Sequence, residues 1–274
     1  MLVDYHMHLR SPREDVEELE HTVAAVERFV ARARERGVNE IGFTEHGYYF
    51  RELAPFATTD YERERCSRPL EPYVEAIVEA KRQGLPVKLG LEVDFVRGRE
   101  EELREALAPF PWDYLLGSVH WIGGAAVDQR PGIWADHSVE AVWRRYFDVL
   151  ASAAASGLFD ALSHPDLVKI WGVRPANGTV QELYERAAEE IAAAGVAAEI
   201  SSAGLRKPVG ELYPNGSLLA ALRERGVPIT LASDAHLPKD VGEGLDRALE
   251  HARAHGYETV TVFDARHARQ EPLG

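Results

Sequence analysis

Short apolar runs alternate with amphipathic stretches along almost the whole chain. Seven runs rich in Val, Ile, Leu and small residues predict strands at residues 2–8, 40–46, 87–95, 114–121, 161–165, 197–202 and 229–236. Between them, apolar residues recur at helical spacing up to a glycine or proline, which predicts helices at 19–36, 71–83, 99–108, 138–156, 179–194 and 215–225. Such alternation through tight turns is typical of parallel βα units. We therefore expect an α/β fold, a seven-stranded (β/α) barrel, with residues 1–274 in one domain.

Three regions depart from this alternation. An apolar run at 258–263 predicts one additional short strand, and the tail that follows it is too polar to assign. The stretches 47–69 and 123–137 show neither pattern. Long loops after barrel strands usually carry lids or substrate contacts, so we expect these two stretches to lie beside the site.

The predicted strands end on residues that can bind a metal ion. His6 and His8 lie two positions apart, so both project from one face of the first strand, either to share an ion or to face the core. Glu92 ends an apolar strand, where a buried carboxylate is costly unless a cation or hydrogen bonds hold it. Equivalent positions are taken by His120, His164 and Asp234. Because barrel active sites form at the C-terminal ends of strands, these six side chains predict a metal site there. Imidazoles mixed with carboxylates suit Zn, Mn or Fe better than Mg.

Composition and charge limit the kinds of partner and the cellular location that we expect. A formal net charge of −14 and a pI near 5.3 argue against a nucleic-acid-binding surface, although a small anion can bind in a locally positive pocket. The single cysteine, Cys66, excludes an internal disulfide, and its charged neighbourhood predicts a structural or neutral role rather than a nucleophile. The N-terminus resembles no secretion signal, and the uncharged stretches are too short to span a bilayer. We expect a cytoplasmic protein without a membrane partner; the sequence assigns no oligomeric state.

Six short motifs follow one another at the ends of the predicted strands. They are His6-Met7-His8, Thr44-Glu45-His46, Gly90-Leu91-Glu92, Gly117-Ser118-Val119-His120, Ser163-His164-Pro165-Asp166 and Ser233-Asp234-Ala235-His236. In this order they resemble the motifs of the PHP (polymerase and histidinol phosphatase) superfamily. Residues 117–121, 164–167 and 202–208 are most similar to histidinol-phosphatases of the PHP type. The resemblance implies a distorted seven-stranded barrel that uses two or three divalent metals to hydrolyse a phosphomonoester, with L-histidinol phosphate of histidine biosynthesis as the substrate.

The resemblance also implies how ligands are divided among the metals. A first ion would bind His6, His8, Glu92 and Asp234, and a second would bind Glu92, His120 and His164. A third ion would use His46 and His236. Many relatives add a histidine in the loop after the first strand, and Glu14 stands at that spacing here. Glu14 or Asp15 can replace the imidazole, and His21, which opens the first helix, is the weaker alternative; the sequence leaves open whether the third site is complete.

Phosphate oxygens need positive charge from the protein as well. Arg206 and Lys207 follow the sixth predicted strand, and Lys169 and Arg174 follow the fifth, on the side where the metals are expected. Arginine can bind phosphate through two parallel hydrogen bonds, so Arg206 and Arg174 are the preferred substrate ligands, although each can instead be a solvated loop residue. Arg206 is also expected to stabilise the transition state, beside the catalytic carboxylates Glu92 and Asp234.

Other residues near the motifs have two interpretations each. Glu45 either supports a histidine ligand or binds a cationic substrate amine. Asp94 is either an outer partner of a ligand or a solvated strand end. The aromatic run Tyr48, Tyr49 and Phe50 either walls an imidazole-bearing substrate or packs within its loop.

Three other functions compete with a phosphomonoesterase. A PHP-type nuclease or nucleotide phosphatase is disfavoured by the acidic charge and the absence of a second predicted domain. An amidohydrolase acting on C–N bonds also begins with His-x-His, but that family usually relies on a lysine after the fourth strand, where this chain has His120. A noncatalytic binding module is hard to reconcile with so many ligand-type side chains.

Overall fold

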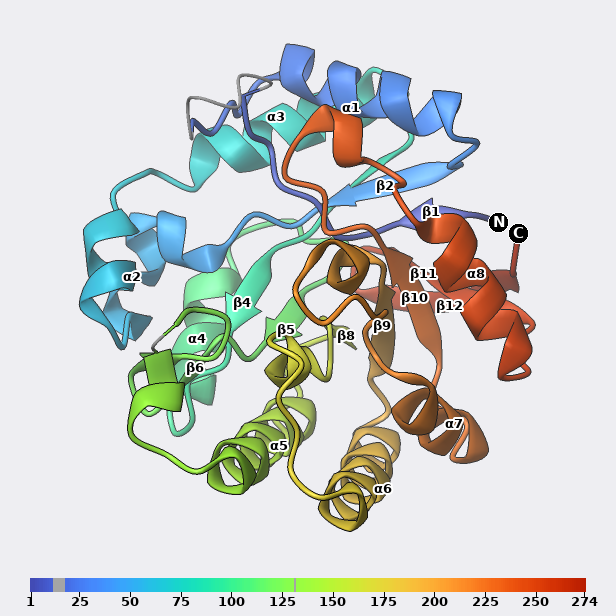
Figure 1. The fold of residues 1–274 in the computed structure, drawn as a ribbon. Coiled ribbons are helices and arrows are strands. Elements are labelled where there is room, and N and C mark those ends of the chain that lie inside the picture. The colour runs from blue at the N-terminus through green and yellow to red at the C-terminus, as the bar shows by residue number, and fades with distance from the viewer. Residues whose placement is uncertain (12–17, 131) are drawn as a thin grey trace.

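Short parallel strands lie at the centre of the molecule, with helices around them (Figure 1). The computed structural model describes residues 1–11, 18–130 and 132–274. The parallel strands form a three-stranded sheet, ordered β1-β2-β3, and a five-stranded sheet, ordered β10-β9-β8-β5-β4. Their bounds are β1 (Val3–Asp4), β2 (Glu40–Phe43), β3 (Val87–Leu89), β4 (Glu92–Asp94), β5 (Leu116–Ser118), β8 (Ala161–Leu162), β9 (Ala197–Ser201) and β10 (Ile229–Ala232).

The six predicted helices are confirmed within a few residues of their expected ends. The bounds are α1 (Val23–Glu35), α3 (Glu71–Arg82), α4 (Glu100–Leu107), α5 (Val139–Ala155), α6 (Asn177–Ala194) and α7 (Gly216–Glu224). Local chemistry sets their limits: the Thr22 side chain accepts a hydrogen bond from Ala25 N at the start of α1, and Gly195 ends α6 with a φ of 72°. The sequence missed α8 (Leu245–Ala254), and α2 (Asp60–Arg65) lies in a stretch expected to be irregular.

The strand expected at residues 87–95 is interrupted. β3 pairs with β2, whereas β4 pairs with β5, so the two halves belong to different sheets. At the break, the Tyr73 hydroxyl donates a hydrogen bond to Gly90 O at 2.8 Å, which occupies a carbonyl that a continuous ladder would use. This contact from a distant helix explains why an apolar run that looks like one strand is divided.

Backbone hydrogen bonds join the two sheets at both edges. Just beyond β1, Tyr5 N donates to Leu231 O of β10 at 2.9 Å, and farther along the chain His8 N donates to Ala235 O at 2.8 Å. Between β2 and β4, Glu92 N donates to Glu45 O at 3.0 Å. The parallel α/β architecture agrees with the prediction, while the strand ladder itself is divided into two sheets rather than forming one continuous ring.

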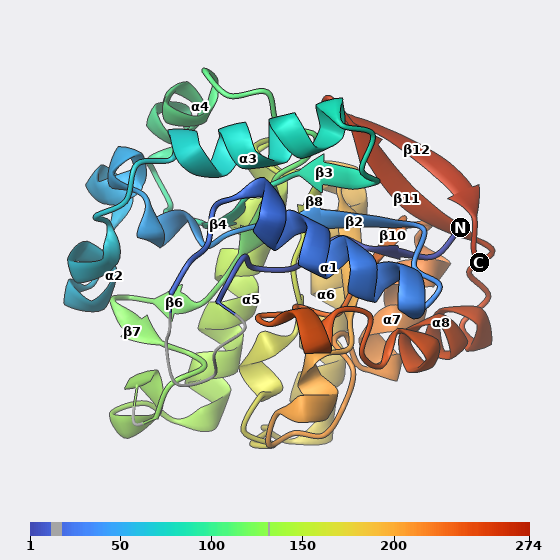
Figure 2. The same ribbon diagram turned by 90° about the horizontal axis from the view of Figure 1, so that it is seen from above.

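A C-terminal hairpin packs against the opposite end of the strands from the metal-binding motifs. It consists of β11 (Thr259–Asp264), which confirms the additional predicted strand, and β12 (His267–Pro272), formed by the tail that was too polar to assign (Figure 2). The ring of Phe263 stacks on Tyr114, with ring centroids 5.1 Å apart. Tyr114 in turn crosses the interior against Gly42, where an added Cβ would lie 2.0 Å from the tyrosine Oη. The core at this end therefore depends on glycine at that strand position.

Loops at the motif end contain short pieces of structure. Residues 121–126 form a two-stranded hairpin of β6 (Trp121–Ile122) and β7 (Ala125–Ala126). The short 3-10 helices are η1 (Gly47–Tyr49), η2 (Arg51–Phe56), η3 (Gly132–Ala135), η4 (Leu167–Lys169), η5 (Ala203–Arg206) and η6 (Pro238–Asp240). In the part of the chain that the structure describes, no helix has the length and apolar character needed to cross a membrane.

Candidate metal centre

The histidines and carboxylates singled out in the motifs converge at one end of the strands. The histidines and Asp234 lie a few residues beyond the C-terminal ends of their strands, as expected for side chains that share this edge of parallel strands, whereas Glu92 lies between the end of β3 and the rest of β4, as its first residue. Their ligand atoms form overlapping groups in which all atoms lie within 4.8 Å of one another. The groups are His8, His46 and His236; His6, Glu92 and His164; His6, His8 and Asp234; and His46, Glu92 and His120.

Glu92 occupies the middle of these groups, with a side chain that is 1% exposed. Its Oε2 lies 2.6 Å from His46 Nδ1, 3.3 Å from His6 Nε2 and 3.9 Å from His8 Nε2. This oxygen therefore faces three imidazoles that come from two different strands.

The other oxygen of Glu92 faces a different pair of imidazoles. Oε1 lies 3.1 Å from His164 Nε2 and 3.6 Å from His120 Nε2, and it accepts a hydrogen bond from Ser118 Oγ at 2.7 Å. A carboxylate whose two oxygens address separate histidine groups has the arrangement of a bridging ligand between two ions.

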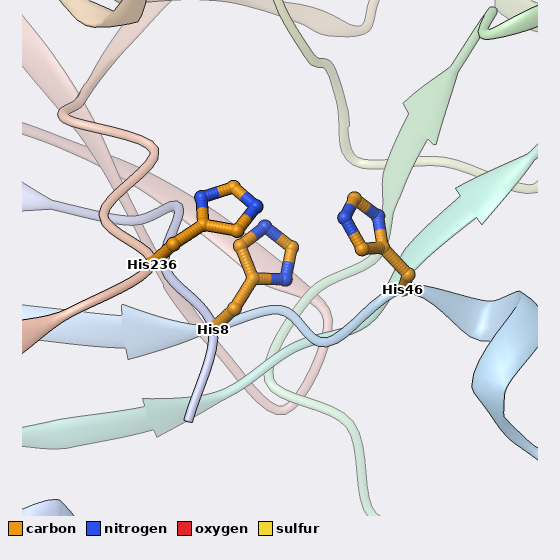
Figure 3. A group of neighbouring side chains, drawn as sticks. All are labelled: His8, His46 and His236. Carbon is orange, nitrogen blue, oxygen red and sulfur yellow. The ribbon is translucent and has the colours of Figure 1, made fainter. Parts of the chain in front are cut away.

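A third group of imidazoles lies beside the first. Figure 3 shows the rings of His8, His46 and His236 gathered at the strand ends. Ring centroids are 4.2 Å apart for His8 and His46, and 4.3 Å apart for His8 and His236. Asp234 Oδ1 lies 3.4 Å from His8 Nε2 and 3.8 Å from His6 Nε2, so this carboxylate connects the first and third groups.

Several buried polar atoms of the cluster make no hydrogen bond with the described residues. Unpartnered buried polar atoms are costly, and folded proteins contain few of them. His46 Nδ1 lies close to Glu92 Oε2, but the two atoms do not form a hydrogen bond with each other. Two such atoms can instead both ligate one cation placed between them. The residues therefore fit a divalent metal. The atoms concerned are His6 Nε2, both nitrogens of His8, His46 Nδ1, Glu92 Oε2 and His164 Nδ1.

Burial and neighbouring charges shift the pKa values of two imidazoles of the cluster in opposite directions. Burial, followed by the positive charge of His8, lowers the pKa of His46 to about 4, which keeps this imidazole neutral and able to ligate. Burial also opposes protonation of His120, but Asp94 and Glu92 raise its pKa to about 10. The carboxylates thus require positive charge, which protons or metal ions can supply.

Outer carboxylates orient two of the imidazoles. Asp94 Oδ1 lies 2.9 Å from His120 Nδ1, which leaves Nε2 facing Glu92, so the geometry favours the outer-partner interpretation of Asp94. Glu199 Oε2 lies 2.8 Å from His6 Nδ1, and its Oε1 accepts a hydrogen bond from the His164 backbone N–H at 3.1 Å. Glu199 was not among the residues predicted from the sequence. A carboxylate inside the apolar run 197–202 was the available signal, the same one that pointed to Glu92.

Glu45 lies behind the histidines and is fully buried. Its Oε1 accepts a hydrogen bond from Leu9 N at 2.5 Å, and its Oε2 lies 3.5 Å from His8 Nδ1. The geometry favours support of a histidine over the alternative of binding a substrate amine. His21 Nε2 lies 3.9 Å from Glu45 Oε1, on the side away from the ligand groups. The candidates Glu14 and Asp15 lie outside the described residues.

Two residues of the cluster adopt strained backbone conformations. His164 has a φ of 24° and Asp234 a φ of 52°, and such positions cost about 1–3 kcal/mol each unless the surroundings hold them. Around Asp234 they do: Ser233 N and Oγ donate to the two carboxylate oxygens of the buried Asp4, at 2.7 and 2.6 Å. Arg206 donates to Ser233 O at 2.6 Å and to Asp234 O at 3.3 Å.

A cavity of about 100 Å³ opens onto the cluster. Of the four cations expected to bind phosphate, Lys207 is the one found among the described residues that line it. The complete lining consists of His46, Tyr48, Tyr61, Glu92, His120, Trp121, Asp128, Gln129, His164, Leu167, Ile170, Lys207, Tyr213, Asp234 and His236.

The other three cations contact groups of the protein itself. Lys169 is fully buried and pairs with Asp166 Oδ2 at 2.8 Å, so its charge is committed to the core. Arg174 pairs with Glu211 Oε2 at 2.7 Å. Arg206 binds backbone carbonyls, as described above, and so supports the turn that carries Asp234. The complete burial of Lys169 argues against its direct contact with a substrate, whereas substrate contacts of Arg174 and Arg206 stay predictions.

Known proteins resemble the chain over most of its length. A Deinococcus radiodurans protein named "Probable histidinol-phosphatase" is 37% identical over 201 residues, which cover 73% of this chain and 75% of that protein. A Bacillus subtilis protein named "Histidinol-phosphatase" is 26% identical over 248 residues, covering 81% of this chain and 91% of that protein.

Solved structures agree on the fold. The crystal structure of histidinol phosphate phosphatase from Lactococcus lactis, complexed with zinc, L-histidinol and phosphate, aligns with a TM-score of 0.75 at 21% identity and covers 98% of each chain. This likeness shows a shared α/β fold. The family model of the PHP domain matches residues 6–203, which include five of the six motifs. The chain therefore belongs to the PHP domain family.

Proposed function

We propose that this protein is a metal-dependent phosphomonoesterase that hydrolyses L-histidinol phosphate to L-histidinol and phosphate, a step of histidine biosynthesis in the cytoplasm. The observation that carries the proposal is Glu92, whose two oxygens face separate histidine groups beneath a cavity that also contains Lys207. The relatives named histidinol-phosphatase support the choice of substrate.

The proposed cofactor is two or three divalent ions of Zn, Mn or Fe. His6, His8, Glu92 and Asp234 would hold the first ion, and Glu92, His120 and His164 the second. His46 and His236 would hold a third, with Glu14 or Asp15 as a further ligand or with His8 turned toward them. Such ions lower the pKa of bound water and neutralise charge on a phosphoryl group.

The protein's own side chains would position the substrate and the ligands. Lys207 lines the cavity and would bind phosphate oxygens by charge. Arg206 would act indirectly, by positioning Asp234. Its hydrogen bonds to Ser233 O and Asp234 O hold the strained backbone at this residue. Asp94 and Glu199 would fix the tautomers of His120 and His6, so that the opposite nitrogen of each ring faces the centre.

We further propose that the strands form one distorted seven-stranded barrel and that residues 1–274 are a single domain. The seven strands are obtained by counting β3 and β4 as one interrupted strand. The backbone hydrogen bonds that join β1 to β10 and β2 to β4 support this closure.

Metal analysis combined with a substrate panel tests the function. The purified protein should contain divalent metal, lose activity to a chelator and regain it with Zn, Mn or Fe, and prefer histidinol phosphate to nucleotides and single-stranded DNA. Glu92→Gln should lower both metal content and kcat/KM by at least about a hundredfold, since a bridging carboxylate holds two ions.

Glu64→Gln makes the same chemical change at an exposed position and serves as the control. Full turnover by a metal-free protein would contradict the mechanism. Preferred cleavage of DNA or nucleotides would instead support the nuclease or nucleotide phosphatase, and cleavage of a C–N bond would support an amidohydrolase.

A further inference from the structure

Asp128 is a carboxylate on the cavity wall that the metal centre does not use. It lies in the loop after β7 and lines the cavity together with His120 and Lys207. Its Oδ1 is buried and accepts no hydrogen bond from any described residue. A buried carboxylate oxygen without a partner is costly, so a position like this favours a ligand that brings a positive charge or a strong donor.

The backbone next to Asp128 is held firmly. Val127 is fully buried, and its N–H donates to His120 O at 2.8 Å. Its carbonyl accepts hydrogen bonds from two indole groups, Trp134 Nε1 at 2.8 Å and Trp171 Nε1 at 3.1 Å. Three hydrogen bonds thus fix the residue that precedes Asp128 and tie it to the strand end that carries His120. The backbone that carries the Asp128 carboxylate is therefore held in place before a ligand binds.

Aromatic side chains line the same cavity. The rings of Tyr61 and Trp121 lie 5.4 Å apart, and those of Tyr48 and Tyr61 lie 5.9 Å apart. Trp121 Nε1 is buried without a hydrogen-bond partner in the described structure. Aromatic faces beside a carboxylate suit an organic cation, because both attract positive charge.

We propose that Asp128 determines specificity by binding a cationic nitrogen on the leaving alcohol of the substrate. This inference rests on the proposed phosphatase activity and defines its substrate class as phosphomonoesters of positively charged alcohols. Lys207 would take the phosphate end of such a molecule and Asp128 its cationic end, within one cavity. Histidinol, which carries an amine and an imidazole, belongs to this class of alcohols.

The experiment compares Asp128→Asn with Asp136→Asn, which removes the same charge from an exposed position in the same loop. Binding of L-histidinol to the metal-loaded proteins is measured by calorimetry. Asp128→Asn should weaken this binding by about ten- to a hundredfold, as expected for the loss of a charged hydrogen bond, while Asp136→Asn should not change it. Metal content should stay the same in both variants.

Turnover separates specificity from general damage. For Asp128→Asn, kcat/KM on histidinol phosphate should fall by a similar factor, mainly through KM. Hydrolysis of p-nitrophenyl phosphate, whose leaving group carries no positive charge, should be unchanged. Equal losses on both substrates, or unchanged histidinol binding, would overturn the role of Asp128.

A second substrate pair keeps this test independent of the natural substrate. If the protein hydrolyses p-nitrophenyl phosphate but not histidinol phosphate, the proposed function fails. Asp128 is then judged on ethanolamine phosphate against glycol phosphate, which differ in an ammonium group and a hydroxyl. The inference is supported if the parent protein prefers ethanolamine phosphate and Asp128→Asn loses this preference. It is overturned if the parent protein hydrolyses both esters at equal rates.

Discussion

At the scale of single residues, carboxylates outside the ligand groups control how the imidazoles point. Glu199 binds Nδ1 of His6 and Asp94 binds Nδ1 of His120, so in both rings Nε2 is directed to the centre. Neither carboxylate belongs to the ligand groups of the described residues, yet each sets the tautomer of a histidine that does. We expect their effect to be on metal affinity rather than on substrate binding.

Cys66 provides a prediction about pH. Burial, and then the negative charge of Glu62, raise the pKa of its thiol to about 11. The reactive thiolate is therefore scarce at pH 8, about one part in a thousand, and grows tenfold per pH unit until about pH 11. Alkylation by iodoacetamide, followed by mass spectrometry, should accelerate accordingly. A rate that levels off near pH 9 would show an ordinary thiol and contradict this environment.

At the scale of elements, side chains from distant segments decide where strands begin and end. The apolar run 87–95 has the composition of one strand, but Tyr73 of α3 binds the carbonyl of Gly90 and the strand divides there. The division leaves Glu92 at the start of β4, where its backbone N–H is bound by Glu45 O. A break in the ladder thus coincides with the residue that we propose as the bridging ligand.

Gly42 tests the packing of these strands. Replacement by alanine would place a Cβ 2.0 Å from Tyr114 Oη, and this crowding should lower the free energy of unfolding by at least about 2 kcal/mol. Gly178→Ala is the matched control, since no atom lies within 4 Å of its added Cβ and alanine favours the helix, so we expect a change below about 1 kcal/mol. Urea unfolding followed by circular dichroism measures both variants. Equal urea midpoints for the two variants would contradict the prediction, because they would show that Tyr114 moves aside without loss of stability.

At the scale of the whole molecule, the parallel strands bring together residues that are far apart in the sequence. Glu92 and His164 are 72 positions apart but lie 3.1 Å from each other, because their strands point the same way. The cluster therefore exists only in the folded chain. Metal binding should then stabilise the folded state, since the unfolded chain has no preformed site.

Removal of metal should lower the midpoint of thermal unfolding. For an ion present at about a hundred times its dissociation constant, the expected decrease is roughly 5–10 °C. Scanning calorimetry of the protein with and without a chelator measures it. Glu92→Gln, which should not retain metal, ought to show little further decrease with chelator. An identical midpoint of the parent protein in both conditions would contradict metal binding at this centre.

The positions of the strands, the helices and most candidate ligands could be predicted because each depends on local pattern. The periodicity of apolar residues and the glycine stops located six helices, and His6 and His8, expected to act together from their spacing of two, do lie in one ligand group. The cations were harder to assign. Lys169 and Arg206 follow the strands as expected, but the direction of their side chains depends on tertiary contacts. Lys169 pairs with Asp166, and Arg206 donates a hydrogen bond to Ser233 O.

The sequence by itself determined the order of the main strands and of six helices, the family resemblance and most of the residues able to bind metal, because these depend on residue type and spacing along the chain. The tertiary structure alone decided which side chains meet: that Glu92 faces two histidine groups, that Glu199 orients His6, and that Asp128 Oδ1 has no hydrogen-bond partner among the described residues. Contacts between distant strands depend on register, packing and burial of the whole chain, and no local pattern encodes them.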